Sequence, residues 1–125
     1  MVARFVQWTV DVADVEIMCQ FWATALGYRV EPGDAGSARL VPPPTAEPGS
    51  PTLWLQPVDE ARTVKNRAHP DLRPTDGDVD AEVDRLLGMG AHRVDVGQAE
   101  NEPFVVLADP EGNEFCVLRR NPPRD

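Results

Sequence analysis

A carboxylate and a thiol stand two positions apart in the stretch LADPEGNEFCVL, residues 107–118. Side chains alternate across a β-strand, so Glu114 and Cys116 are predicted to share one face. Glu114 could act as a general base if it reached a substrate proton and had a raised pKa. Cys116 would be a nucleophile only with a lowered pKa, and no sequence neighbour supplies positive charge for that. The alternative for Cys116 is a small buried residue.

A histidine in the strand-like run NRAHPDLRP, residues 66–74, is the next group that could do chemistry. We predict that His69 and Glu114 are catalytic, with His69 as general acid or ligand, because imidazole titrates near neutral pH. The alternative is a structural imidazole bonded to the backbone or to Asp71. Pro70 has no backbone N–H to donate, so this strand is predicted to lie at a sheet edge or to carry a bulge.

Polar side chains also share one face of two strand-like runs in the first half of the chain. In TLWLQPV, residues 52–58, alternation places Trp54 with Gln56, and Leu53 with Leu55 on the opposite face under a helix. A hollow with a polar rim and an aromatic wall is typical of a small-molecule site. The alternative is that these side chains hydrogen-bond one another in a closed interior. The residues predicted to bind a ligand are Gln7, Thr9, Asp11, Trp54, Gln56 and Cys116.

The elements that would position these residues occur twice in the same order. Asp14 has the position of a helix N-cap and Gly27 that of a left-handed C-cap. Asp76 or Asp78 has the N-cap position in the second half. Helices are predicted over 15–26 and 79–90, and strands over 4–10, 28–32, 38–42, 52–58, 66–74, 91–96, 103–108 and 113–119.

This repeat predicts the fold class. Each half reads strand, helix and three strands, and LGYRV at 26–30 resembles MGAHRV at 89–94. A half of this kind has a sheet face that it cannot bury alone, so repeated units are expected to pack together. We predict an α+β fold of two βαβββ modules that form one curved, eight-stranded mixed sheet, with a concave inner face. The chain 1–125 is expected to be one domain, with module one over about 1–60 and module two over about 66–120.

Composition excludes several classes of function. The apolar fraction of 42% and charged fraction of 26% are those of an ordinary globular protein. A net charge of −9 argues against nucleic-acid binding, and no apolar run approaches the roughly 20 residues of a membrane span. The N-terminus lacks the pattern of a signal peptide, and the two cysteines are expected to be free thiols in a reducing compartment. We therefore expect a cytoplasmic protein with no nucleic-acid or membrane partner.

FWATALGY at the end of the first predicted helix and ADPEGNEF before the last strand resemble the vicinal-oxygen-chelate superfamily. Its members include glyoxalase I, extradiol dioxygenases, and bleomycin and fosfomycin resistance proteins. The segments KNRAHPDLRPTDGDVDAEVDRLLGMGA and VVLADPEGNEFCVLR are similar to the second module of its small glyoxalase-like members. The resemblance implies the two-module fold and a homodimer, but it does not identify a substrate, because one fold hosts many functions.

The resemblance also implies a divalent metal in the cup, held by His or Gln, His, and Glu side chains on the strands. Carried over by position, those ligands fall on Gln7, His69, Gln56 and Cys116, and only His69 is a strong match. One imidazole, two amides and one thiol suit no divalent ion well. We assign no metal ligand and leave the cofactor unknown, with Gln7, His69 and Glu114 as the candidates if a metal is bound.

The sequence leaves three classes of function open. We predict a glyoxalase-like protein with a small-molecule site in the cup, which binds or converts an organic substrate, as a lyase or isomerase if it is an enzyme. The first alternative is a metal-free protein that sequesters a ligand, as resistance proteins do. The second alternative is a non-catalytic structural dimer with a filled cup.

Overall fold

The computed structural model describes residues 1–121, and the chain divides into two compact units between Ala61 and Arg62. We call the first unit module one and the second module two. Both modules follow the order strand, helix, strand, strand, strand. This confirms the predicted α+β class with two βαβββ modules, and the eight strands form two four-stranded mixed sheets, one in each module.

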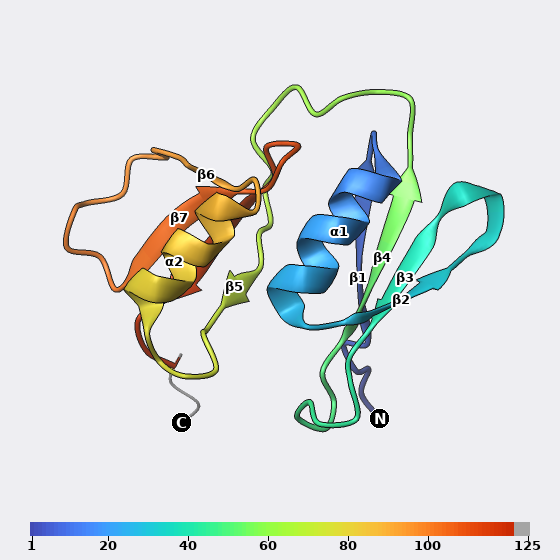
Figure 1. Cartoon of the computed structure of the whole chain (residues 1–125), viewed down its shortest axis with the longest axis horizontal. Coiled ribbons are helices and arrows are strands. Elements are labelled where there is room, and N and C mark those ends of the chain that lie inside the picture. The colour runs from blue at the N-terminus through green and yellow to red at the C-terminus, as the bar shows by residue number, and fades with distance from the viewer. Residues whose placement is uncertain (122–125) are drawn as a thin grey trace. The chain divides into compact units, whose positions relative to one another are not determined.

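Module one has its strands in the spatial order β1-β4-β3-β2, with β1 parallel to β4 and the other pairs antiparallel. Helix α1 packs on β3 and β4 and lies across one face of this sheet (Figure 1). A short 3-10 helix, Asp34–Gly36, lies between β2 and β3. The elements are β1 (Gln7–Val12), α1 (Val15–Leu26), β2 (Arg29–Pro32), β3 (Ala38–Val41) and β4 (Thr52–Pro57).

Module two repeats this topology with the order β5-β8-β7-β6, in which β5 is parallel to β8. Helix α2 lies across one face of that sheet (Figure 1). The elements are β5 (Asp71–Leu72), α2 (Val79–Gly88), β6 (His92–Arg93), β7 (Phe104–Ala108) and β8 (Glu114–Leu118). No described helix is long and apolar enough to span a bilayer.

Both helices begin at an aspartate that accepts a hydrogen bond from the first turn. The Asp14 carboxylate accepts from the Ile17 N–H at 3.1 Å, and the Asp78 carboxylate accepts from the Ala81 N–H at 3.0 Å. Such a bond satisfies an N–H that has no partner inside the helix. Gly27 ends α1 with φ +69°, which only glycine adopts without steric cost. The predicted caps Asp14 and Gly27 are confirmed, and Asp78 is the cap in module two.

Each helix buries its apolar side against its own sheet. Met18, Phe21 and Trp22 of α1 are buried, and so are Val79, Val83 and Leu86 of α2. The sheets supply the other half of each core. Their buried apolar residues are Val12, Ala38, Leu40, Leu53 and Leu55 in module one, and Val106, Leu107, Ala108, Phe115, Cys116 and Val117 in module two.

Two predicted strands are shorter than expected. The run 66–74 forms a ladder only at Asp71–Leu72, and the run 91–96 only at His92–Arg93. Pro70 cannot donate to a ladder, and β5 does lie at an edge of the module-two sheet, as predicted. The Cys116 N–H still donates to the Pro70 carbonyl at 3.0 Å, so the chain remains beside β8 there.

Candidate functional site

Five predicted ligand-binding residues lie side by side on the face of the module-one sheet that is opposite α1. The parallel register aligns β1 with β4, so that Gln7, Thr9 and Asp11 stand opposite Thr52, Trp54 and Gln56 in that order. Leu53 and Leu55 on the other face are buried, as predicted. We call the face formed by Gln7, Thr9, Asp11, Trp54, Gln56 and Arg39 the open face of module one.

Trp54 is the aromatic residue of the open face, and two contacts fix its ring. Its indole N–H donates to the Gln56 side-chain oxygen at 2.9 Å. The backbone of Gly33 lies against the ring edge, because a Cβ atom built on Gly33 would stand 2.8 Å from Trp54 Cη2 and 2.4 Å from Ser37 Oγ. The β2–β3 loop therefore holds the indole in place and leaves it half-buried.

Arg39 belongs to the open face, and the sequence reasoning missed it. It pairs with Trp54 in the register of β3 with β4, and with Glu31 in the register of β2 with β3. The Glu31 carboxylate accepts from Arg39 at 2.6 Å and from Arg29 at 2.9 Å, and these bonds hold the pKa of Glu31 below its usual range. The signal was present, because Ala38 and Leu40 are the apolar neighbours that place Arg39 on the open face.

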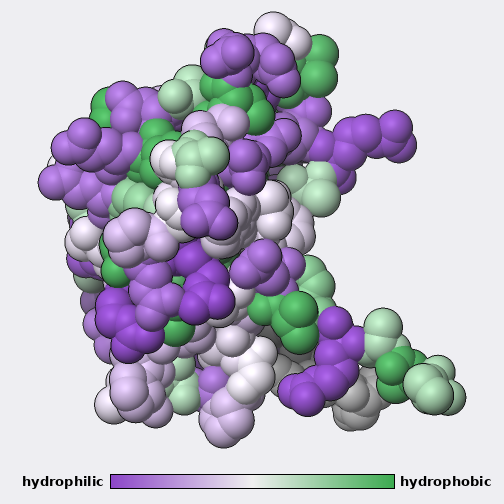
Figure 2. All heavy atoms as spheres, turned by 90° about the vertical axis from the view of Figure 1, so that its right-hand side faces the viewer, coloured by the Kyte–Doolittle hydropathy of each residue, from purple (hydrophilic) through white to green (hydrophobic). Residues whose placement is uncertain are grey.

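The open face is polar overall. Five of its six residues, all except Trp54, are polar or charged, and on the side of the molecule that Figure 2 shows, hydrophobic groups are scattered among hydrophilic ones. The Gln7 side-chain oxygen already accepts a hydrogen bond from the Thr52 hydroxyl at 2.8 Å. Two arginines around one glutamate also give the region of Glu31 a local charge of +1 (two positive, one negative) in a chain whose net charge is −9.

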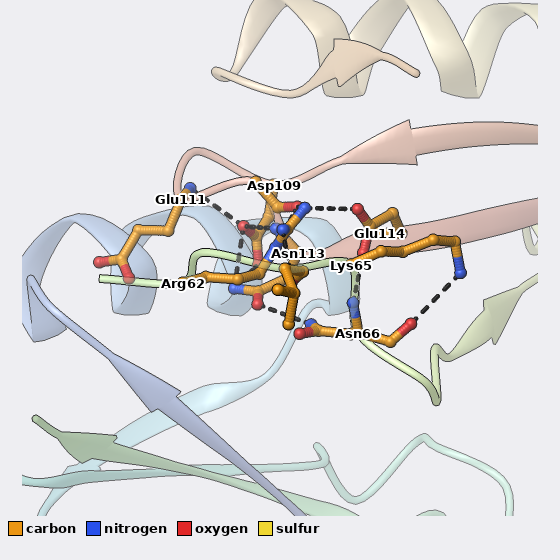
Figure 3. Close-up of polar contacts among 9 residues, drawn as sticks. Arg62, Lys65, Asn66, Asp109, Glu111, Asn113 and Glu114 are labelled. Carbon is orange, nitrogen blue, oxygen red and sulfur yellow. Dashed lines mark hydrogen bonds and ion pairs between the residues drawn. The ribbon is translucent and has the colours of Figure 1, made fainter. Parts of the chain in front are cut away.

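Glu114, the predicted general base, lies in module two and is held by two donors. Its side chain is 5% exposed, and one carboxylate oxygen lies 2.5 Å from the Arg62 guanidinium. The other oxygen accepts from the Asn66 backbone N–H at 3.3 Å (Figure 3). Arg62 also donates to the Gly112 carbonyl. The carboxylate thus ties the segment 62–66 to the final hairpin.

The DPEGN turn beside Glu114 has a structural role, because side chains and backbone groups within it hydrogen-bond one another. Asp109 is fully buried, and one of its oxygens accepts from the backbone N–H groups of Glu111 at 3.0 Å and Asn113 at 2.9 Å. The Asn66 side chain donates to the Asn113 side-chain oxygen at 2.8 Å (Figure 3). These bonds fix the direction in which β8 begins.

The role of Arg62 as the partner of Glu114 was not predicted, because a lone arginine in a loop carries no sequence signal.

His69 and Cys116 do lie together, and Asp71 completes a cluster with them. Their ligand atoms all lie within 4.8 Å of one another, and His69 Nδ1 is 3.6 Å from the Asp71 carboxylate. The parallel pairing of β5 with β8 sets Asp71 opposite Cys116. We call His69, Asp71 and Cys116 the β5–β8 cluster. The sequence reasoning considered Asp71 only as a partner of His69, although the spacing His-x-Asp suggested one shared side of the chain.

Cys116 is not an activated nucleophile in this arrangement. Burial raises the pKa of its thiol to about 11, and the negative charge of Asp71 and a hydrogen bond with it add to the rise. The positive charge of Lys65 acts in the opposite direction but more weakly. A thiol with so high a pKa is protonated at neutral pH, whereas nucleophilic cysteines need the thiolate.

The metal set carried over from the superfamily does not fit these residues. The side-chain oxygens of Gln7 and Gln56 each accept a hydrogen bond from a neighbour in module one. Glu114 is paired with Arg62, and a buried thiol stands where a hard cation would need a carboxylate. We therefore derive no chemistry through a hard divalent ion. The predicted catalytic roles of His69 and Glu114, and the cup shared by both modules, stay predictions.

Solved structures of related fold cover nearly the whole chain. A glyoxalase/bleomycin resistance protein/dioxygenase family enzyme from Burkholderia phytofirmans is 16% identical, with a TM-score of 0.69 over 92% of this chain and 97% of that one. A glyoxalase/bleomycin resistance protein from Albidiferax ferrireducens is 19% identical, with a TM-score of 0.65 over 94% and 98%. At such identities these likenesses show the fold alone.

A third similar structure has a ligand bound. The fosfomycin resistance protein FosX from Listeria monocytogenes, as its E126Q mutant with Mn(II) and 1S,2S-dihydroxypropylphosphonic acid, is 11% identical, with a TM-score of 0.75 over 97% of this chain and 93% of that one. A search of curated proteins gave no significant match. The model of the family described as glyoxalase-like domain matches residues 7–118. The chain therefore belongs to the glyoxalase-like domain family of the vicinal-oxygen-chelate superfamily.

Proposed function

We propose that this glyoxalase-like protein binds a small organic molecule with an aromatic or other apolar group on the open face of module one. The observation that carries the proposal is Trp54, a half-buried indole held by Gly33 and Gln56 among polar neighbours. An apolar wall with a few fixed polar groups is the usual composition of a small-molecule site.

Polar groups beside the indole are placed to orient such a ligand. Thr9 stands opposite Trp54 on β1, and Arg39 stands opposite it on β3, so a hydroxyl and a guanidinium flank the ring. Glu31 fixes the guanidinium without neutralising both arginines. A planar guanidinium recognises a carboxylate or a similar oxyanion well. The ligand class that fits is therefore a small aromatic or cyclic molecule with an acidic or oxygenated substituent.

Binding is better supported than proton transfer by Glu114. A general base must be free to accept a proton from the substrate. The Glu114 carboxylate instead holds Arg62 and the Asn66 N–H, and the Cys116 thiol has a raised pKa. A glyoxalase-type lyase or isomerase, with His69 as acid and Glu114 as base, is the second candidate. It predicts that Glu114→Gln abolishes turnover while the folded state is kept.

A thermal-shift screen against small aromatic acids and cyclic oxygenated compounds tests binding. A ligand that binds only the native state raises the free energy of unfolding, by about 2.7 kcal/mol at a concentration 100 times the Kd. The melting temperature rises as a result. We expect hits that the wild type and Trp8→Phe share and that Trp54→Phe loses. Trp8 is the matched control, because its position on β1 alternates with Thr9 and so faces the other side of the sheet. Hits that survive Trp54→Phe undiminished would contradict the assignment.

A further inference from the structure

We propose that the ligand of the open face is a zwitterion, with an anionic group that Arg39 binds and a cationic group that Asp11 binds, on either side of a ring. This inference rests on the proposed function, because it needs a small molecule on the open face, and it goes further by naming the charges of that molecule. Two observations carry it, namely the positions of the two charged side chains and the polar atoms of both that have no partner.

The two charges stand on opposite sides of β4, which lies between β1 and β3 in the sheet. Arg39 of β3 pairs with Trp54 of β4, and Asp11 of β1 pairs with Gln56, two positions further along β4. Neighbouring strands lie about 4.8 Å apart and rise about 3.3 Å per residue, which puts the Cα atoms of Arg39 and Asp11 about 12 Å apart. A ligand that covers the indole can therefore approach Arg39 with one end and Asp11 with the other.

Arg39 has N–H donors left for an anionic group. Its Nη2 donates to the Glu31 carboxylate at 2.6 Å, whereas its Nε and Nη1 make no hydrogen bond within the described residues. Arg29 donates to the other oxygen of Glu31, so two guanidinium groups share one carboxylate. The bond to Glu31 limits the motion of the Arg39 side chain. Its remaining N–H groups can bind a carboxylate of the ligand, the planar geometry in which arginine recognises oxyanions.

Asp11 supplies the acceptor on the other side of β4. The residue is exposed, and its carboxylate makes no hydrogen bond or ion pair with any residue in the range 1–121. The Thr9 hydroxyl, next along the same face of β1, also has no hydrogen-bond partner in that range. An ammonium group has donors and no acceptor, so a carboxylate beside a hydroxyl suits it. A lone exposed aspartate would be ordinary surface charge, but Asp11 stands across a fixed indole from a fixed guanidinium.

The separation of the two side chains sets the length of the ligand. Side chains stand roughly perpendicular to a sheet, so the charged ends of Arg39 and Asp11 lie about as far apart as their Cα atoms. One hydrogen bond of about 2.9 Å at each end leaves about 6 Å between the two charges of the ligand. A benzene ring with a carboxylate at one end and an aminomethyl group at the other has this length. The two charges of an α-amino acid lie too close together to reach both side chains.

Three compounds with the same benzene ring test this inference. The zwitterion is 4-(aminomethyl)benzoate, while 4-methylbenzoate lacks the ammonium group and 4-methylbenzylamine lacks the carboxylate. We expect an NMR titration of the full chain to give a Kd for the zwitterion at least about threefold below the Kd of either other compound. The gain is modest because ion pairs in contact with solvent are weak. Asp11→Asn should remove the preference over 4-methylbenzoate, and Arg39→Gln should remove the preference over 4-methylbenzylamine.

Matched controls are Asp59→Asn and Arg4→Gln, which each remove one charge from an exposed position outside the open face. Both should keep the preference for the zwitterion. The inference is overturned if the wild type binds the zwitterion no better than 4-methylbenzoate, if Asp11→Asn keeps the preference, or if Asp59→Asn loses it equally. If Trp54→Phe weakens binding in that case, the proposed function stands and only the zwitterion assignment falls. If no compound binds the wild type, or if all bind Trp54→Phe undiminished, both fail.

Discussion

Glu114 is the most buried glutamate of module two, and its ion pair with Arg62 decides whether its role is structural or catalytic. Glu114→Gln keeps the shape of the side chain but leaves the Arg62 guanidinium without its counter-charge. We expect the variant to lose about 1–3 kcal/mol of unfolding free energy, the usual cost of breaking a hydrogen-bonded charged pair. Urea unfolding measures the loss. An unchanged m-value would show that the variant exposes the same surface area on unfolding as the wild type.

Glu60→Gln is the control, since Glu60 is an exposed residue with the same charge. Surface substitutions of this kind usually change stability by no more than about 0.5 kcal/mol. A double-mutant cycle with Arg62→Gln should show that the two losses are not additive, because they remove one interaction. If Glu114→Gln were as harmless as Glu60→Gln, the carboxylate would be free for catalysis and the account given for it would be wrong.

The Cys116 thiol gives a second prediction at the scale of a residue. Its pKa of about 11 means that the metal-free folded protein holds a neutral thiol, whereas the unfolded chain ionises near the ordinary value. The neutral thiol therefore adds stability below the unfolded pKa, and that contribution is lost as the pH rises toward 11. We expect alkylation of Cys116 by iodoacetamide, in a Cys19→Ser background, to stay slow through pH 9 and to accelerate above it.

A rate profile with its midpoint near neutral pH would show an activated thiolate and contradict this reading.

At the scale of a residue, the sequence predicted which side chains share a face, because strand alternation is a local rule. It placed Leu53 and Trp54 on opposite faces, and it brought His69 and Cys116 into one site. It did not find the roles of Arg39 or Arg62, and it did not place Asp71 beside Cys116, since each of these depends on a partner from another strand or loop.

At the scale of an element, two glycine-to-alanine substitutions compare a crowded loop position with an uncrowded helix position. Gly33→Ala would force a methyl group against Ser37 Oγ and the edge of the Trp54 ring. We expect a loss of about 1–3 kcal/mol from this overpacking, together with a change in tryptophan fluorescence as the indole shifts. Chemical unfolding and the emission spectrum check the two effects.

Gly88→Ala is the matched substitution in α2, where the backbone is helical and no atom beyond the neighbouring helix backbone lies within 4 Å of the added Cβ. It should stabilise the protein by about 0.5–1 kcal/mol, because glycine costs that much in a helix relative to alanine. If Gly33→Ala behaved like Gly88→Ala, the β2–β3 loop would not support the indole. The open face would then lack a fixed aromatic wall.

Helices were the most predictable elements, and short strands the least. Asp14 and Asp78 cap their helices with the side-chain bonds that their positions predicted. The strands β5 and β6 shrink to two residues each, because edge ladders depend on the partner strand and on a proline that cannot donate. Local signals therefore fix where elements begin, and tertiary pairing fixes how far strands run.

At the scale of the whole molecule, the two modules repeat one topology, and the family model matches across both of them. Both sheets have the same order of strands, and the family match extends over residues 7–118. The two-module topology was predictable, because local helix and strand patterns recur in the same order in both halves of the sequence. The ligand was not predictable, because members of one fold differ in the few side chains that line their sites.

The most direct test of the central claim uses the indole N–H signals of the three tryptophans in a two-dimensional NMR spectrum of the 13.8 kDa protein. Trp8→Phe, Trp22→Phe and Trp54→Phe assign the signals. When a compound from the thermal-shift screen is added, the Trp54 signal should shift as the site fills, because its N–H bond to Gln56 lies on the open face. The signals of Trp8 and Trp22 should stay in place. Shifts confined to Trp8 or Trp22, with Trp54 unmoved at saturation, would show that the ligand binds elsewhere.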